Sequence, residues 1–425
     1  MDTIVALASA QGRAGVAVIR VSGPQAWEVC EKLAGFVPPA REARLARLRN
    51  SDGETIDSAL VLAFAEGSSF TGEKVCEFQV HGSIAVVAAV LRACLFCDGV
   101  RAAEAGEFTR RAFLDGRMDL TGVEALADLI DAETDAQRRQ ALSVMEGAAA
   151  RVIETWREDL LQALAMLEAA LDFSDEELPE DLVNHVLAPL VRVRGGLASQ
   201  LGGRQAAEAV RSGFEVAIIG PVNAGKSSLL NALSGREAAI TSARAGTTRD
   251  VIEVRMEIAG LAVTLIDTAG LREAQDEIER IGIERGQSRA AQADLRVFLQ
   301  GAPGEPAEGV LPGDLVVLSK ADIWNAPGIS ATTGTGLPWL IDEIAARLRT
   351  RAASSSVFTR ERHFDKLSRA MSRIDGAVDG LHRESSWDLV GEDVKLAIRA
   401  LDGIIGRVDV EEVLGRIFSS FCIGK

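Results

Sequence analysis

The chain has 425 residues, of which 47% are hydrophobic and 25% charged, and its formal net charge is −16. The length predicts two or three domains, each large enough to bury a core of its own. The excess of acidic residues argues against a protein that coats nucleic acid by bulk electrostatics, so such a contact needs a local basic patch or a partner.

The five cysteines are spread along the chain and do not form the pattern of a disulfide framework. Cys94 and Cys97 form a CxxC inside an apolar stretch, without a second Cys/His pair at metal spacing, which predicts packed helix thiols rather than a zinc or redox site. The start MDTIVALASA lacks a basic region, and Arg92 interrupts the longest apolar run. We therefore expect neither a signal peptide nor a membrane span, and a cytoplasmic location.

The hydrophobic pattern changes three times along the chain. Residues 1–117 mix short β-rich runs such as VAVIRVSG with helical stretches, which indicates an α+β domain. Residues 118–211 have helical periodicity, residues 212–349 alternate strand and helix, and residues 350–425 are helical again. Alternation predicts a parallel sheet covered on both faces, so the pattern predicts an α/β domain inserted into an all-α helical domain.

The segment GPVNAGKS, residues 220–227, fits G-x-x-x-x-G-K-[ST] between a predicted strand and a predicted helix. In that setting the glycine-rich turn directs backbone N–H groups at phosphate, Lys226 neutralises charge, and the Ser227 hydroxyl can ligate Mg²⁺. The sequence therefore predicts a phosphate-binding loop.

Four further stretches favour GTP over ATP. DTAG at 267–270 ends a strand and places Asp267 near the Mg²⁺, while AGTTRD offers Thr248 as a second hydroxyl ligand. SKAD at 319–322 supplies Asp322, whose carboxylate can accept from guanine N1–H and the 2-amino group, and SATTGTG from Ser330 forms the base-contacting loop. Together these stretches predict a Ras-like P-loop GTPase domain.

Two positions depart from the usual pattern of such domains. Ser319 stands where an Asn is usual, which predicts guanine selectivity with weaker nucleotide retention. Leu271 stands where Ras-like enzymes have a Gln that orients water. Either hydrolysis is very slow, or another residue positions the water and another cation balances the charge.

The C-terminal tail SSFCIGK leaves three readings open. A prenylation box fits poorly, because Gly424 is not aliphatic and no polybasic run lies upstream. The tail is then either a packed helix end that happens to contain Cys422, or a segment that reaches into a site elsewhere.

Across essentially its whole length the chain resembles the MnmE (TrmE) family of bacterial tRNA-modification GTPases. The likeness is carried by the N-terminal DTIVALASAQGRAGVAVIRVSG, by FTRRAFLDGRMDLTGVEALADLID, by GPVNAGKSSLLNALSGREAAI, AGTTRD and DTAGLREAQDEIERIGIER, and by the terminal LGRIFSSFCIGK. The resemblance implies a tetrahydrofolate-binding-like α+β domain, followed by a helical domain in two parts with the GTPase domain between them.

The resemblance also implies a folate site. Arg20, Glu77 and Lys425 would contact 5-formyltetrahydrofolate or 5,10-methylenetetrahydrofolate, with the C-terminal tail closing over the carrier. A carboxylate suits the pterin edge, and cations suit the glutamyl carboxylates. Arg117 stands where family members commonly have Lys, so its contact has a different geometry. For Cys422, packing and thiolate chemistry both remain open.

Family resemblance assigns the water-positioning role to Glu279, with Lys226 as the second catalytic residue. A K⁺ ion would replace the arginine finger, held by Asn223, Ser242, Arg244 and Thr247, while Mg²⁺ would be held by Ser227 and Thr248. Ala243 stands where relatives have an acidic residue. Arg249, Asp250 and Arg272 would act as switch residues between two GTPase domains.

The residues expected to contact GTP are Asn223, Ala224, Gly225, Lys226, Ser227, Ser228, Ser242, Ala243, Arg244, Ala245, Gly246, Thr247, Thr248, Asp267, Thr268, Ala269, Gly270, Lys320, Asp322, Ser330 and Ala331.

The activity implied is K⁺-dependent GTP hydrolysis coupled to the addition of a (carboxymethyl)aminomethyl group at C5 of the wobble uridine (position 34) of certain tRNAs. The expected partners are a second copy of the chain, tRNA, and the FAD-dependent protein MnmG, which brings FAD and NADH in a heterotetramer or larger assembly. Ammonium and glycine both remain open as nitrogen donor. The alternative is a ribosome-assembly or signalling GTPase of the Era/Der class.

Overall fold

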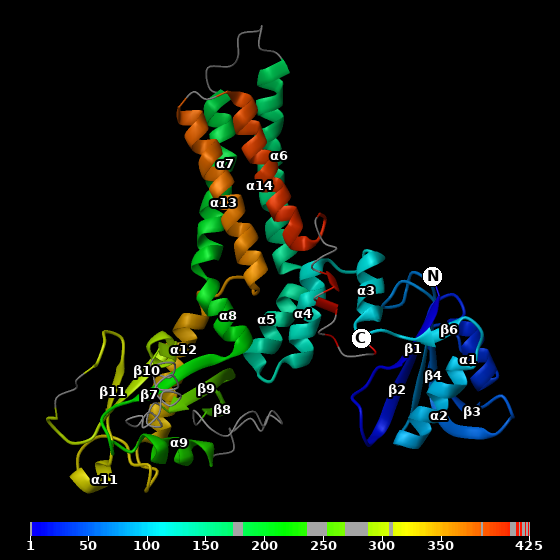
Figure 1. Ribbon diagram of the computed structural model, residues 1–425, viewed down its shortest axis with the longest axis horizontal. Coiled ribbons are helices and arrows are strands. Elements are labelled where there is room, and N and C mark those ends of the chain that lie inside the picture. Colours follow the sequence, from blue (N-terminus) through cyan, green and yellow to red (C-terminus); the bar gives the residue numbers. More distant parts are fainter. Residues whose placement is uncertain are drawn as a thin grey trace, which may run out of the picture. The chain divides into compact units, whose positions relative to one another are not determined.

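The computed structural model describes residues 2–172, 182–235, 253–267, 288–305, 309–383 and 386–408, together with 414, 415, 417, 418, 421 and 424 (Figure 1). The described chain divides into two compact units. One contains residues 1–127 and 405–425, and the other contains residues 128–404. Each unit has its own sheet.

The sheet of the first unit has six strands in the order β3-β4-β5-β2-β1-β6. All neighbours are antiparallel except β1 and β6. The strands are β1 (Thr3–Leu7), β2 (Ala14–Ser22), β3 (Arg44–Arg49), β4 (Thr55–Phe64), β5 (Val75–Gly82) and β6 (Val100–Ala102). The helices are α1 (Ala26–Ala34), α2 (Ile84–Leu95), α3 (Glu107–Leu114) and the start of α4 (Leu120–Asp131).

The core of this sheet is built from every second residue of the central strands. Ile19 and Val21 of β2 and Phe78 and Val80 of β5 are buried together with Cys30 of α1. Because side chains alternate between the two faces of a strand, Arg20 (between Ile19 and Val21) and Glu77 (before Phe78) project to the opposite face. This alternation places Arg20 and Glu77 together on one face of the sheet.

A network of ion pairs fixes α3 to the start of the chain. Glu107, whose side chain is 2% exposed, accepts from Arg101 at 2.5 Å and from Arg111 at 3.0 Å. Arg111 also reaches Glu73 at 3.0 Å and Asp2 at 2.8 Å. Burial disfavours the charged form of Glu107, but the hydrogen bonds from Arg101, the Glu104 backbone N–H and Arg111 outweigh it and lower its pKa to about 2.

The second unit contains a helical part. Some of its helices precede the five-stranded sheet in the sequence and the others follow it. Its helices are α5 (Asp135–Met145), α6 (Ala148–Asp172), α7 (Leu182–Gly202), α8 (Arg204–Ser212), α13 (Glu361–His382) and α14 (Trp387–Ile405). α7 packs against both α6 and α13 (Figure 1). Ion pairs join Arg194 to Asp375 at 2.6 Å and Lys395 to Glu168 at 3.2 Å. Among the described residues, no helix is long and apolar enough to cross a membrane.

The sheet of the second unit has five strands in the order β11-β10-β7-β9-β8, and only β8 runs antiparallel to its neighbour. The strands are β7 (Phe214–Ile219), β8 (Glu253–Ile258), β9 (Leu261–Asp267), β10 (Leu295–Gln300) and β11 (Leu315–Leu318). The helices are α9 (Lys226–Ser234), α11 (Ala321–Trp324) and α12 (Leu337–Ala352). Its core contains the alternate residues Phe214, Val216 and Ile218 with Leu229 and Leu340. The mostly parallel sheet expected for residues 212–349 is present, but among the described residues no helix separates β8 from β9 or β10 from β11.

We predict that Glu107→Gln lowers the stability of the first unit by about 3 kcal/mol at pH 7, the lower end for breaking a buried pair, because Arg101 is partly exposed. The folded-state pKa lies below the ordinary value of 4.5, so the carboxylate contributes stability above about pH 4.5, and this is lost as pH falls toward 2. The free energy of unfolding can be measured by urea denaturation followed through the fluorescence of Trp27, which lies in the same unit. Variant and wild type should converge only below about pH 2, the folded-state pKa.

Glu104→Gln is the matched control, since Glu104 is 69% exposed and lies 3.8 Å from Arg110. It should leave the unfolding midpoint unchanged at every pH. Identical pH profiles for Glu107→Gln and wild type would contradict the role given to the network.

Candidate functional site

The loop between β7 and α9 has the backbone that a phosphate site requires. Gly220 has φ +142°, and a Cβ built there would lie 2.4 Å from the carbonyl oxygen of Leu299 on β10. Gly225, the residue before α9, has φ +93°, and the exposed Asn223 has φ +64°. Only glycine fits at 220, and the turn leaves the free N–H groups of α9 at its mouth.

The side chain of Lys226 folds back into this turn and contacts its backbone. Its side chain is 6% exposed, and Nζ donates to the carbonyl oxygens of Gly220 at 2.7 Å and Pro221 at 2.8 Å. Burial lowers its pKa, although the nearby Asp267 opposes this. The ammonium is therefore placed inside the curve of the loop, where a phosphate bound by the backbone would meet it.

The parallel pairing of β7 with β9 brings a hydroxyl and a carboxylate together. Ile218 lies opposite Asp267 in the register, and the Ser227 Oγ donates to Asp267 Oδ2 at 2.7 Å. Oxygen donors of these two kinds are the ligands that Mg²⁺ prefers, so this pair fits the expected ion. Ala224 of the loop is buried, whereas Ser227 and Ser228 are exposed at the start of α9.

The two loops expected to contact a base are joined by backbone hydrogen bonds. Ala321 N donates to Ile329 O at 3.0 Å, next to Ser330, which is buried. Lys320 has φ +54°, while Asp322 is exposed and Ala331 partly exposed. Ser319, in the position of the usual Asn, donates its hydroxyl to Gln300 O at 3.0 Å and so ties β11 to β10.

Many expected site residues lie outside the described part of the chain. These are Ser242, Ala243, Arg244, Ala245, Gly246, Thr247, Thr248, Arg249, Asp250, Thr268, Ala269, Gly270, Leu271, Arg272, Glu279, Cys422 and Lys425.

In the first unit, the expected folate residues Arg20 and Glu77 pair with each other. They are opposite one another in the β2–β5 register, and Arg20 Nε donates to Glu77 Oε1 at 2.8 Å. The guanidinium carbon lies 5.7 Å from the ring centroids of both Phe70 and Phe108. The pair is partly buried, with side chains 23% and 15% exposed. The site thus offers a guanidinium and a carboxylate beside two aromatic rings.

The described part of the C-terminal tail packs on the same unit. Phe418 and Phe421 are buried with Val123, and both lie against Gly106, whose Cβ position is 3.0 Å from Phe418 and 3.1 Å from Phe421. Gly424, at φ +101°, lies so close to β1 that a Cβ would be 1.9 Å from Leu7 O. The neighbour of Leu7 in β1, Ala6, is paired with Arg20. Gly424 therefore lies beside the strand that pairs with Arg20.

Arg117 is held in a different way from Arg20. Its Nε donates to Asp115 Oδ2 at 3.0 Å, and its Nη2 donates to the carbonyl oxygen of Gly67. The side chain is 33% exposed. It therefore fixes the turn after α3 to the loop before β5.

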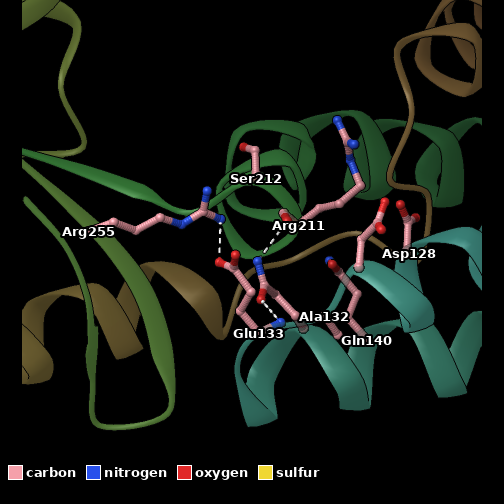
Figure 2. A pocket seen from close by; sticks show the side chains of 9 residues that line it. Asp128, Ala132, Glu133, Gln140, Arg211, Ser212 and Arg255 are labelled. Carbon is pink, nitrogen blue, oxygen red and sulfur yellow. Dashed lines mark hydrogen bonds and ion pairs between the residues drawn. The ribbon is translucent and has the colours of Figure 1, made fainter. Parts of the chain in front are cut away.

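Sequence reasoning missed a set of ion pairs that involve charged residues of β7 and β8 in the five-stranded sheet. Arg289 pairs with Glu215 at 2.8 Å and with Glu253, while Arg255 pairs with Glu133 at 2.8 Å. Arg255 and Glu133 border a polar cavity of about 400 Å³ that Gln140 and Arg211 also line, as Figure 2 shows. The charges at every second position of β8 were visible in the sequence, but they do not indicate with which residues they pair.

Comparisons with known proteins cover both units. The model of the MnmE helical domain matches residues 120–422, and the model of the GTP-binding protein TrmE N-terminus matches residues 3–117. The chain is 53% identical to the tRNA modification GTPase MnmE of Cereibacter sphaeroides and 51% identical to that of Roseobacter denitrificans, each over 100% of both chains.

Among solved structures, Aquifex aeolicus Era bound to GDP·AlF₄⁻ is 25% identical over 32% of this chain and 56% of that one, with a TM-score of 0.25. The identity over full length and the two family models agree with one another. The chain is thus a GTP hydrolase that belongs to the MnmE (TrmE) family of tRNA modification GTPases.

Proposed function

We propose that the protein uses GTP hydrolysis, activated by K⁺, to drive the modification of the wobble uridine of certain tRNAs in the cytoplasm. With a partner of the MnmG kind, which supplies FAD and NADH, it would add an aminomethyl or carboxymethylaminomethyl group at C5. The carbon would come from a tetrahydrofolate derivative bound by the N-terminal unit. The GTPase domain would be an insertion in the helical domain, and the protein a homodimer.

The GTPase part of the proposal is supported by the loop geometry. Lys226 is aimed into the phosphate turn, and Ser227 and Asp267 are paired at 2.7 Å, where Mg²⁺ would be held together with Thr248. Asn223 stands exposed at the mouth of the turn, where its side-chain oxygen is available to K⁺. We assign the orientation of the attacking water to Glu279. When bound, K⁺ would supply positive charge between the β- and γ-phosphates.

The observation that carries the folate proposal is the contact of Gly424 with Leu7 O. Gly424, the residue before Lys425 in the sequence, lies beside the strand that pairs with Arg20. Arg20 and Glu77 suit a reduced folate, whose pterin edge carries donors and acceptors and whose tail is anionic. Phe70 and Phe108 flank the guanidinium and give the site apolar walls. Arg117 is the fourth proposed contact.

Binding of 5-formyltetrahydrofolate to the purified chain, measured by calorimetry, tests this function. A GTPase of the Era or Der class would give no binding. Saturable binding that is lost in Arg20→Ala supports the proposal.

Gly424→Ala should weaken folate binding by at least about tenfold, because a Cβ there meets Leu7 O and a positive φ strains alanine. GTP turnover should stay near wild type, since the P-loop lies in the other unit. Gly415→Ala is the control, because no atom lies within 4 Å of its Cβ position. Unchanged folate binding in Gly424→Ala would remove the tail from the site.

GTP hydrolysis should be fast in KCl and slow in NaCl at equal ionic strength, because an oxygen cage of this kind selects by ion size. Asn223→Ala should lose most of the K⁺ response while nucleotide affinity, which rests on Lys226 and the backbone, changes little. Asn223→Gly separates carbonyl loss from strain, since glycine tolerates φ +64°. A normal K⁺ response in Asn223→Gly would show that the side-chain oxygen is not a ligand.

Replacing Glu279 by Ala should cut the single-turnover hydrolysis rate by about 10²-fold, the scale of a positioned acid–base group, with little change in GTP affinity. Glu279→Gln should recover part of the rate if orienting water matters more than charge. Normal turnover in Glu279→Ala would mean that another group orients the water.

A further inference from the structure

The chain that follows β10 packs directly against the phosphate turn. A Cβ built at Gly301, the residue after β10, would lie 3.9 Å from the Pro221 Cγ, and a Cβ built at Gly220 would lie 2.4 Å from the carbonyl oxygen of Leu299. Gly220 and Pro221 are the two residues whose carbonyl oxygens accept from Lys226 Nζ. The end of β10 therefore supports the same backbone that holds the lysine.

Residues 300–305 form a loop that is closed by its own side chains. Gln300 Nε2 donates to the carbonyl oxygen of Glu305 at 2.7 Å. Glu305 Oε2 accepts from the backbone N–H groups of Gly301 and Ala302, each at 3.1 Å. Because side-chain oxygens satisfy its backbone donors, the loop keeps this shape without a bound ligand.

Trp324 joins the expected base-binding segment to this loop. The single turn of α11 contains Asp322, and the N–H groups of Ile323 and Trp324 both donate to the carbonyl oxygen of Lys320, at 2.8 and 3.2 Å. At the end of this turn, the indole Nε1 of Trp324 donates to the carbonyl oxygen of Gly301 at 2.9 Å. Gly301 thus lies against the phosphate turn and also accepts from α11.

This arrangement matters because GTP carries its base and its phosphates at opposite ends. A ligand that binds through two ends gains affinity only when the two parts of the site stand at the spacing that the ligand spans. Pro221 and Trp324 belong to distant parts of the chain, and both contact Gly301. The loop at residues 300–305 is therefore placed to set that spacing.

We propose that Trp324 and Glu305 are positioning residues for GTP binding. Through Gly301 they fix α11, and with it Asp322, relative to the phosphate turn. The inference rests on the proposed contact of Asp322 with guanine, and neither Trp324 nor Glu305 is assigned a contact with the nucleotide. Their loss should therefore weaken nucleotide binding while the hydrolysis of bound GTP changes little.

Trp324→Phe tests the hydrogen bond, because it keeps an aromatic ring and removes the N–H donor. The Kd of GDP, measured by calorimetry with Mg²⁺, should rise about fivefold, within the range of one hydrogen bond, since the nucleotide must then order α11 itself. The single-turnover rate at saturating GTP should stay within about twofold of wild type. Trp324 is 43% exposed, so its replacement should disturb the core little.

Pyrophosphate separates a change of spacing from damage to the phosphate turn. It occupies only the phosphate part of the site, so its inhibition constant against GTP hydrolysis, at fixed free Mg²⁺, should differ by less than about twofold between Trp324→Phe and wild type. A variant with a distorted phosphate turn would lose affinity for pyrophosphate and GDP alike.

Glu305 gives a second, independent perturbation of the same loop. Glu305→Ala should also raise the Kd of GDP, whereas Glu305→Gln should retain most of the affinity, because its amide oxygen can still accept from Gly301 and Ala302. The double variant Trp324→Phe/Glu305→Ala should lose less than the product of the two single losses, since both residues act through Gly301.

Trp339→Phe is the matched control, because Trp339 is 51% exposed and lies on α12 of the same unit. Its Kd for GDP should stay within about twofold of wild type, as is usual for surface substitutions. Asp322→Asn tests the contact on which the inference rests. A carboxylate accepts from the 2-amino group of guanine, whereas an amide can donate to the 2-carbonyl of xanthine, so the preference should change from GDP to xanthosine diphosphate.

A wild-type Kd of GDP in Trp324→Phe, or an equal loss in Trp339→Phe, would overturn the positioning role. An equal loss of pyrophosphate affinity, or fully multiplicative losses in the double variant, would do the same. Unchanged GDP affinity in Asp322→Asn would overturn the proposed base contact and the inference with it. A loss in Asp322→Asn beside a normal Trp324→Phe would support the base contact and overturn the inference alone.

Discussion

The parallel pairing of β7 with β9 is the constraint on which the phosphate site depends. Its register sets Ile218 opposite Asp267, so both strands leave the sheet at one edge and Ser227 meets the carboxylate there. On the other side of β7, the pairing with β10 brings Leu299 O against Gly220 and admits no side chain at the turn. A shift of one residue in either pairing would reverse the faces of the strand and separate these groups.

Strand register has the same importance in the N-terminal unit. Arg20 is flanked by Ala6 on β1 and Glu77 on β5, and this places the charged pair on the face opposite to the core of Ile19, Val21 and Phe78. The contact of Gly424 with β1 then brings residues from the two ends of the chain to one place. Each site is thus assembled across strands, and the helices supply the core that holds the strands in register.

The sequence predicted the elements of the phosphate site because glycine spacing, a lysine and a strand–helix switch are local signals. The same is true of the strand that ends at Asp267. The pairing of Arg20 with Glu77 was not predictable, because these residues are 57 positions apart and only the register brings them together. Ser319 shows a second limit of the sequence-based prediction. Its presence in place of the usual Asn suggested weaker nucleotide retention, but its hydrogen bond to the carbonyl oxygen of Gln300 on β10 could not be predicted from the sequence. Arg289 and Glu215, 74 positions apart, were missed for the same reason as Arg20 and Glu77.

The charges of β8 have a consequence for how this molecule meets others. β8 is an edge strand, and Glu253, Arg255 and Glu257 occupy every second position along it. β3, an edge of the other sheet, carries Arg44, Arg47 and Arg49. A strand added to either edge would have to pass beside these charges, which is how natural sheets resist fibre-like growth. These charges therefore disfavour self-association through the backbone hydrogen bonds of β3 and β8.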